Sequence, residues 1–237
     1  MAGKKKPLYD IFTAVPGKYD LINCIFIWGL DARWRLEAAQ TCLKTHPSEI
    51  LDLCCGTGDL TIKLAQLATL DTTVIGLDYS QPMLERAKEK TSHLRLKKQP
   101  MFTQGDVADL PFPDGNFDCI GISFAFRNLT HKNQLTQRYL AEILRILKPG
   151  GRFIIVESSQ PPNPLIRKLD HIYLRTFIRW IGFLLSGNKP AYTYLSESTQ
   201  KFYYAEELGD LLIKAGFSKF SVKRLLFGAV VIHTAVK

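Results

Sequence analysis

The sequence of 237 residues lacks any run of about eighteen uncharged apolar residues, so we expect no membrane-spanning helix. The basic N-terminal segment MAGKKKPLYD is followed by neither an apolar segment nor a small-residue cleavage site, which argues against a secretory signal. The five cysteines include no C-x-x-C pair, and an odd number indicates free thiols rather than disulfides or zinc ligands. We therefore expect a cytoplasmic protein without a metal site.

Internal repeats, low-complexity tracts and Gly/Ser linkers are also missing, which indicates a single domain over residues 1–237. The net charge of +9 admits three kinds of partner: nucleic acid, an acidic ligand or an anionic membrane surface. Between residues 167 and 179 the basic side chains are interleaved with Leu, Ile, Phe and Tyr, which suits a lipid interface better than a nucleic-acid backbone. The chain also lacks an Asn/Asp-Pro-Pro-Tyr motif for an extruded base, so we expect no nucleic-acid partner.

Short apolar or β-branched runs alternate with helical patterns through the middle of the chain. The runs cover residues 49–54, 73–77, 100–104, 117–123 and 152–157. This alternation predicts an α/β fold with parallel strands and helices on both faces of the sheet. Ser80 and Pro82 mark the start of one helix, and the turn at 148–151 marks the end of another. Two further strand patterns meet at Phe227-Gly228 and predict an antiparallel C-terminal hairpin, which gives a seven-stranded, mostly parallel sheet.

The most informative segment is LDLCCGTGDL, where an apolar strand ending in Asp52 runs into Gly56-Thr57-Gly58 and a helical pattern. Glycines let the backbone approach a ligand closely, and the free N–H groups of the following helix favour a carboxylate or phosphate. A dinucleotide fingerprint would need Gly or Ala three residues after Gly58, where this chain has Thr61. NAD and FAD are therefore disfavoured.

Acidic residues follow the next strands. Asp78 lies about twenty residues after Gly58, the distance expected of a carboxylate that accepts both ribose hydroxyls, although an Asp there can also cap a helix. A third strand closes with Gly105-Asp106-Val107, and a fourth ends at Ser123. The carboxyl ends of parallel strands meet at one edge of the sheet. We expect these residues to line one crevice there: Thr57, Asp78, Asp106, Val107 and Ser123.

In this order and spacing, LDLCCGTGDL, GLDYSQPML, GDVADLPFPDGNFD and LRILKPGG resemble the class I methyltransferases, which have a Rossmann-like fold and use S-adenosylmethionine. The resemblance implies that Asp78, with Tyr79 beside it, holds the ribose and that Asp106 and Val107 hold the adenine. The Gly56–Gly58 loop would hold the methionine end, and Asp52 would anchor that loop or meet the amino group.

Further segments resemble the ubiquinone and menaquinone biosynthesis C-methyltransferase family over nearly the whole chain. They are KYDLIN at 18–23 with GLD and RWR at 29–35, CCGTGDLT, ISFAFRN at 122–128 and YTYLSES at 192–198. The resemblance implies C-methylation of a polyprenyl quinol, with a demethylmenaquinol-type acceptor favoured. Two alternatives stay open: another small phenolic or amine acceptor, and a catalytically silent cofactor-binding component of a quinone-biosynthesis assembly.

Methylation of a quinol carbon requires loss of the hydroxyl proton before or during transfer. Arg127 would stabilise the phenolate and Asn128 would orient the other oxygen. The candidates for proton relay, among which the base is not assigned, are Tyr19, Asp20, Tyr194 and Glu197. Each residue also has a structural alternative: packing for the tyrosines, an ion pair for Arg127 and a helix cap for Glu197.

We expect residues 1–45 to form an N-terminal helical cap over the substrate and 46–160 the cofactor-binding core. Residues 161–204 would form a helical lid, and 205–237 a C-terminal helix with the hairpin. Segment 164–186 mixes apolar and basic positions at helical spacing, which is typical of a helix packed on the core or of a lid that accepts the prenyl tail and touches the bilayer. Peripheral contact with the inner face of the cell membrane and a homodimer are further possibilities.

Overall fold

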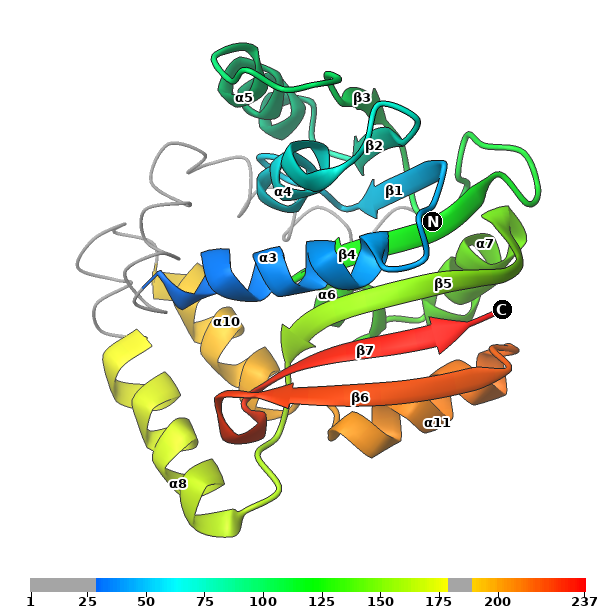
Figure 1. Ribbon diagram of the computed structural model, residues 1–237. Helices are drawn as coiled ribbons and strands as arrows, with labels where there is room; N and C mark the ends of the chain where they lie inside the picture. The colour runs from blue at the N-terminus through cyan, green and yellow to red at the C-terminus, as the bar shows by residue number, and fades with distance from the viewer. Residues whose placement is uncertain (1–28, 179–188) are drawn as a thin grey trace.

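A computed structural model describes residues 29–178 and 189–237 (Figure 1). Seven strands form one sheet in the order β3-β2-β1-β4-β5-β7-β6. The strands are β1 (Glu49–Leu53), β2 (Thr73–Asp78), β3 (Met101–Gln104), β4 (Phe117–Ser123), β5 (Leu147–Ser158), β6 (Lys219–Leu225) and β7 (Val230–Val236). Strand β7 runs antiparallel to both β5 and β6, whereas β3, β2, β1, β4 and β5 pair in parallel. The predicted sheet and its C-terminal hairpin are confirmed.

Helices cover both faces of this sheet. The helices of the described residues are α3 (Leu30–Leu43), α4 (Asp59–Leu67), α5 (Gln81–Ser92), α6 (Phe126–Thr130), α7 (Thr136–Ile146), α8 (Pro164–Tyr173), the π-helix η1 (Leu174–Ile178), α10 (Lys189–Gln200), α11 (Ala205–Ala215) and the 3₁₀ turn η2 (Leu226–Gly228). Neighbouring strand residues face opposite layers, since Ile50 packs with α3 and α4 while Leu51 packs with α7 and α11. Burial on both faces explains why the strands read as continuous apolar runs.

Strand β5 begins earlier than predicted. Leu147 already pairs with Phe117, and the register then shifts before Arg152 pairs with Cys119. Gly150, with φ of 75°, makes the intervening turn. The predicted stop of the preceding helix is confirmed, because α7 ends at Ile146.

The described part of the predicted N-terminal cap is α3, which packs directly on the sheet. Trp34, Ala38 and Cys42 are buried there against β1, β4 and α4. Residues 1–28 lie outside the described residues, so the cap stays a prediction. The thiols of the described cysteines, Cys42, Cys54, Cys55 and Cys119, are free, as expected.

In the predicted lid, η1 and α10 contact each other. The Ser196 hydroxyl donates to the carbonyl of Leu174 at 2.9 Å, and Arg175 Nε donates to Gln200 Oε1 at 2.9 Å. Helix α8 lies at the edge of the molecule and has no fully buried residue (Figure 1). Across the described ranges, we find no helix with the length and apolar character that a membrane span requires.

Candidate active site

The carboxyl ends of the five parallel strands meet at one edge of the sheet, and the backbone there is strained. Cys54 follows β1 with φ of 56°, and Phe124 follows β4 with φ of 54°. A positive φ is uncommon outside glycine, and such conformations concentrate at functional sites. This edge is therefore the candidate active site.

The glycine loop after β1 folds as expected of a ligand-binding turn. Gly56 has φ of 55°, and a Cβ there would meet no atom within 4 Å. Gly58 has φ of 82° and precedes α4, and a Cβ there would lie 2.9 Å from the Cβ of Ala87. Gly56 thus leaves open space above the loop, whereas Gly58 lets α4 and α5 pack closely.

Asp78 ties this loop to the end of β2. Its Oδ2 accepts from the N–H of Gly56 at 2.8 Å, and its Oδ1 accepts from the N–H of Ser80 at 2.8 Å. Burial raises the pKa of this carboxyl, although both N–H groups favour the charged form. The bond to Ser80, the residue that precedes α5, holds the Asp78 carboxylate between the start of that helix and the loop.

Asp52 is a deeply buried acid at this edge, with 1% of its surface exposed. Oδ2 accepts from the Thr61 hydroxyl at 2.6 Å, while the buried Oδ1 has no hydrogen-bond partner among the described residues. Burial raises the pKa of Asp52 to about 7, against the opposing effects of Thr61 and Arg35. An unpartnered buried carboxylate oxygen is costly, and a cationic or N–H-bearing ligand would offset that cost.

The other predicted cofactor residues follow β2 and β3. Asp106 Oδ1 accepts from the N–H of Ala108 at 3.0 Å, which holds its carboxylate in the turn after β3. Val107 is 6% exposed and belongs to the hydrophobic core. Tyr79 exposes about half of its side chain beside Asp78. The carboxylates of Asp52, Asp78 and Asp106 therefore lie at the carboxyl ends of three adjacent strands, β1, β2 and β3.

Arg35 reaches this edge from α3. Its Nε donates to the Ser123 hydroxyl at 3.0 Å, and its guanidinium lies 5.3 Å from the centre of the Phe124 ring. The same guanidinium bonds Asp31, and it lies 3.8 Å from Asp59. Ser123 is thus bonded to a cation that the sequence did not assign to the site.

Arg127 forms a buried ion pair. Nη1 lies 3.0 Å from Glu157 Oε1 and 2.8 Å from Ser158 Oγ, and the backbone N–H of Arg127 donates to Glu157 Oε2 at 3.1 Å. Arg127 is 6% exposed and Glu157 is 0% exposed, while Arg127 Nε has no partner among the described residues. Arg127 therefore forms an ion pair with a carboxylate next to the strand ends, which is the structural role that the sequence offered beside a catalytic one.

The remaining predicted catalytic residues divide into three groups. Asn128 follows Arg127 in α6 and is partly buried, and its carbonyl accepts from Asn133. Glu197 is exposed on α10. Tyr194 lies in α10, but its side chain is outside the described part, and Tyr19 and Asp20 lie wholly outside the described residues. Of the predicted catalytic residues whose side chains the structure describes, Arg127 and Asn128 lie beside the strand ends, and Glu197 is exposed on α10.

Two residues that bond predicted site residues, Arg35 and Glu157, were not predicted from the sequence. Arg35 stands four residues after Asp31, a spacing at which opposite charges pair on a helix. Glu157 stands near the end of an apolar strand, where a charged residue is buried only with a partner. Either signal points to a buried charge, but neither identifies its partner across the fold.

The loop residue Thr57 is bonded by a lysine of α5. Lys90 Nζ donates to the Thr57 hydroxyl at 3.2 Å and pairs with Asp59 at 2.5 Å. Lys90 thus links α5 to the start of α4 and holds the loop between them. The described residues contain no cluster of three or more side chains suited to a metal ion.

These features fit a nucleoside-type cofactor with a cationic end. Carboxylates follow β2 and β3 where hydroxyl and amino groups would be recognised, and the open space over Gly56 admits a ligand next to the backbone. The orphaned oxygen of Asp52 is suited to an ammonium or sulfonium group.

Comparison with known proteins agrees with this assignment. The model of the ubiE/COQ5 methyltransferase family matches residues 1–237. A demethylmenaquinone methyltransferase of Lactobacillus johnsonii is 39% identical over 98% of this chain and 93% of its own length. The corresponding enzyme of Thermus thermophilus is 37% identical, with 94% and 98% covered. A ubiquinone/menaquinone biosynthesis C-methyltransferase UbiE of Pseudomonas savastanoi pv. phaseolicola is 33% identical, with 99% and 90% covered.

Solved structures share the fold at lower identity. A SAM-dependent methyltransferase of Thermotoga maritima, described as a possible histamine N-methyltransferase, aligns with a TM-score of 0.62 and 21% identity over 97% of this chain and 99% of its own. A similar protein of Methanococcus maripaludis has a TM-score of 0.62 at 21% identity, with 93% and 92% covered. The predicted methyltransferase fold is confirmed, and the chain belongs to the ubiE/COQ5 methyltransferase family.

Proposed function

We propose that this enzyme transfers the methyl group of S-adenosylmethionine to a ring carbon of a polyprenyl quinol of the demethylmenaquinol type. The observation that carries the proposal is the buried Arg127–Glu157 pair beside the edge that holds Asp52, Asp78 and Asp106. A fixed cation at a cofactor edge suits an acceptor that becomes an anion. The names of the relatives support the same substrate class.

When bound, S-adenosylmethionine supplies an electrophilic methyl group on a cationic sulfur. Asp78 would accept the ribose hydroxyls, and Asp106, with Val107, would hold the adenine. The Gly56–Gly58 loop would let the backbone approach the methionine end, and the unpartnered oxygen of Asp52 would meet its ammonium. Each of these contacts is made by a residue at a strand end.

The acceptor carbon must lie about 3–3.5 Å from the methyl group, with water excluded. Arg127 would stabilise the negative charge of the quinol as its hydroxyl loses a proton, and Asn128 would orient the second oxygen. Glu157 fixes the guanidinium of Arg127 before the acceptor binds, so little reorganisation accompanies the reaction. Tyr19, Asp20, Tyr194 and Glu197 stay as candidates for proton relay.

The cap of residues 1–45 and the lid of residues 161–204 would enclose the ring and its tail. A prenyl tail implies that the acceptor resides in a bilayer, so we extend the proposal to peripheral contact with the inner face of the cell membrane. A homodimer stays a prediction.

The direct test is methyl transfer from labelled S-adenosylmethionine to chemically reduced demethylmenaquinone, with a demethoxy-benzoquinol and a tail-less naphthoquinol beside it. We expect label on the ring carbon of the prenylated naphthoquinol, located by mass spectrometry. Cofactor binding without transfer to any quinol would contradict the proposal and favour a small non-quinol acceptor or a silent component.

Two variants separate cofactor binding from turnover. Asp78→Asn should weaken cofactor binding at least about tenfold, since it removes a charged acceptor. Arg127→Lys should leave cofactor affinity within about twofold and lower kcat about 100-fold, a loss typical of one stabilising donor. Asp71→Asn, at an exposed site in the loop before β2, is the matched control and should resemble the wild type. Equal cofactor affinity in Asp78→Asn and the wild type would overturn the site assignment.

A further inference from the structure

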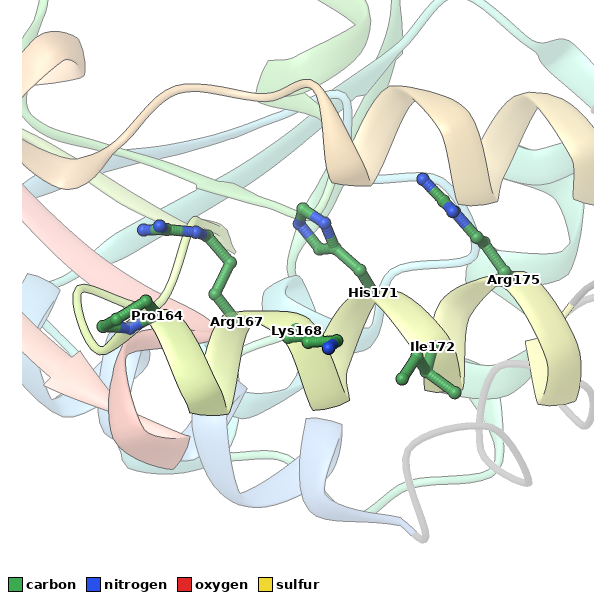
Figure 2. Close-up of a pocket in the computed structure, with 6 residues that line it drawn as sticks. All are labelled: Pro164, Arg167, Lys168, His171, Ile172 and Arg175. Atoms are coloured by element: carbon green, nitrogen blue, oxygen red, sulfur yellow. The ribbon is translucent and has the colours of Figure 1, made fainter.

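Helix α8 is amphipathic with its apolar side turned outward. Leu165, Leu169 and Ile172 are spaced at helical intervals and are 66%, 59% and 49% exposed. On the opposite side, His171 bonds Gln160 at 2.8 Å and Arg167 lies over Tyr204. Figure 2 shows Arg167, His171 and Arg175 projecting together toward the neighbouring helix and Ile172 projecting the other way. A helix packed on a protein core has the reverse arrangement.

The hairpin between β6 and β7 adjoins the start of α8. A Cβ on Gly228 would lie 2.7 Å from Pro162 Cδ, and the N–H of Ser159 donates to the carbonyl of Ala229 at 2.9 Å. At the tip, Leu226 and Phe227 are 46% and 75% exposed. Both have positive φ, 44° and 55°, so the strained turn keeps two large apolar side chains in solvent.

These apolar side chains are clustered on the molecule. Of the eleven large hydrophobic side chains exposed in the described residues, five belong to α8 and the hairpin tip. Scattered exposed hydrophobics are ordinary, but a contiguous group marks a contact surface. We define the docking surface as Leu165, Lys168, Leu169, Ile172, Leu226 and Phe227.

The charges around the docking surface identify its partner. Lys168 is exposed within it and makes no ion pair among the described residues, whereas Arg175 projects toward α10, where its Nε donates to Gln200. Asp170 is the one acid of α8; it is partly buried, and its pKa is raised to about 6 by burial. A symmetric second copy of the chain would bring one Lys168 toward the other, whereas anionic headgroups complement this cation.

We propose that α8 and the β6–β7 hairpin tip form a docking surface for an anionic phospholipid bilayer. Phe227 and Leu226 enter the boundary of the acyl region, and Leu165, Leu169 and Ile172 follow along α8. Lys168 lies at headgroup level. The inference deepens the proposed function, since a docked enzyme would receive its prenylated acceptor directly from the bilayer, and it names the contacting residues.

The test is co-flotation of the full chain with vesicles of phosphatidylcholine, with and without phosphatidylglycerol. We expect binding that requires phosphatidylglycerol and weakens with salt. Phe227→Glu and Leu169→Glu should each reduce the partition coefficient at least about tenfold, because an apolar contact is replaced by a repelled charge. Lys168→Gln should reduce it about fivefold, the effect expected for one cation near an anionic surface.

Leu70→Glu is the matched control, since Leu70 is 65% exposed in the loop between α4 and β2, away from α8. It should bind vesicles as the wild type does, and unchanged cofactor affinity in all four variants would show intact folding. Wild-type affinity of Phe227→Glu and Leu169→Glu for the vesicles, or no vesicle binding by the wild type, would overturn the inference. If these variants instead convert a dimer to a monomer without changing vesicle binding, a second copy occupies the surface and the inference is wrong.

Turnover of a tail-less reduced naphthoquinol in the absence of vesicles separates this inference from the proposed function. Normal turnover in Phe227→Glu with lost vesicle binding supports both. Normal turnover in Phe227→Glu with unchanged vesicle binding contradicts the docking surface but not the proposed function.

Discussion

Arg127 and Glu157 are bonded both through the guanidinium and through the backbone N–H of Arg127, at 3.0 and 3.1 Å. This pair connects α6, which follows β4, to the end of β5. Both side chains are nearly inaccessible to solvent, so removal of one charge leaves the other buried without compensation. The pair is therefore important for stability as well as for the position of the cation.

We expect Glu157→Ala to lower the free energy of unfolding by about 3–5 kcal/mol, as for other buried pairs broken on one side. Glu157→Gln keeps the shape and an acceptor oxygen, so it should fold but lower kcat about 10- to 100-fold through misplacement of Arg127. Cofactor affinity should stay unchanged. Denaturant unfolding and steady-state kinetics measure the three quantities.

The control for this prediction is Glu206→Gln. Glu206 is exposed and pairs with Arg224 at the surface, where such pairs contribute at most about 1 kcal/mol. If Glu157→Gln retains wild-type kcat, Glu157 does not position Arg127 for the role that we propose for it.

Much of the fold follows from local patterns in the sequence. The segment 119–122 of strand β4 is apolar because it is buried on both faces, and Ser80 and Pro82 correctly predict the start of α5. The hairpin at Phe227-Gly228 is equally local, since two strand patterns meet at one turn. Such features depend on neighbours in the chain.

The site is less predictable, because its contacts join distant segments. Arg35 bonds Ser123 across 88 positions of the chain, and Arg127 bonds Glu157 across 30. No periodicity encodes those pairings. The outward apolar side of α8 is a further case, since a helical pattern shows that a helix is amphipathic but not which side faces the core.

The two glycines of the loop should respond differently to substitution. In Gly56→Ala the added methyl group meets no atom, so the only cost is the positive φ, about 1 kcal/mol of stability. The methyl group would, however, project into the space proposed for the cofactor. Gly58→Ala adds a 2.9 Å approach to Ala87 and should destabilise the fold by about 2 kcal/mol or more. Thermal unfolding without ligand and calorimetric titration with S-adenosylmethionine distinguish the two effects. A larger loss of stability in Gly56→Ala would contradict the geometry.

Asp52 should make the protein less stable as the pH rises. Its folded pKa of about 7 is above the ordinary value of 3.8, so its contribution is fully present below pH 3.8 and is lost as the pH rises through 7. Asp52→Asn should therefore be more stable than the wild type at pH 8, by up to about 4 kcal/mol, and the difference should vanish near pH 4.

The same substitution should weaken cofactor binding, because the charge that destabilises the free protein is the one that we propose meets the ammonium group of the cofactor. In the wild type, affinity should fall as the pH drops below about 7. In Asp52→Asn that dependence should disappear. A variant that is less stable than the wild type at pH 8 would show that the Asp52 charge is already compensated in the free protein.

His233 on β7 should destabilise the protein at acid pH. Both ring nitrogens are buried and have no hydrogen-bond partner among the described residues, and the ring stacks on Phe220 at 6.0 Å. Burial lowers the pKa of His233 from 6.5 to about 4, with a smaller effect from Arg224. Between these two values the unfolded chain binds a proton that the folded chain does not, so stability is lost as the pH falls from 6.5 to 4.

The expected loss is about 3 kcal/mol, at 1.36 kcal/mol for each pKa unit. His233→Phe keeps an aromatic ring against Phe220 and removes the titration, so the difference between wild type and variant should change across this interval and stay constant above pH 7. His93→Gln, at an exposed position after α5, should follow the wild type. Urea unfolding at a series of pH values measures the difference. A constant difference between wild type and His233→Phe from pH 4 to 7 would mean that the folded protein accommodates the proton on His233, because the charged ring would then have a partner or access to water.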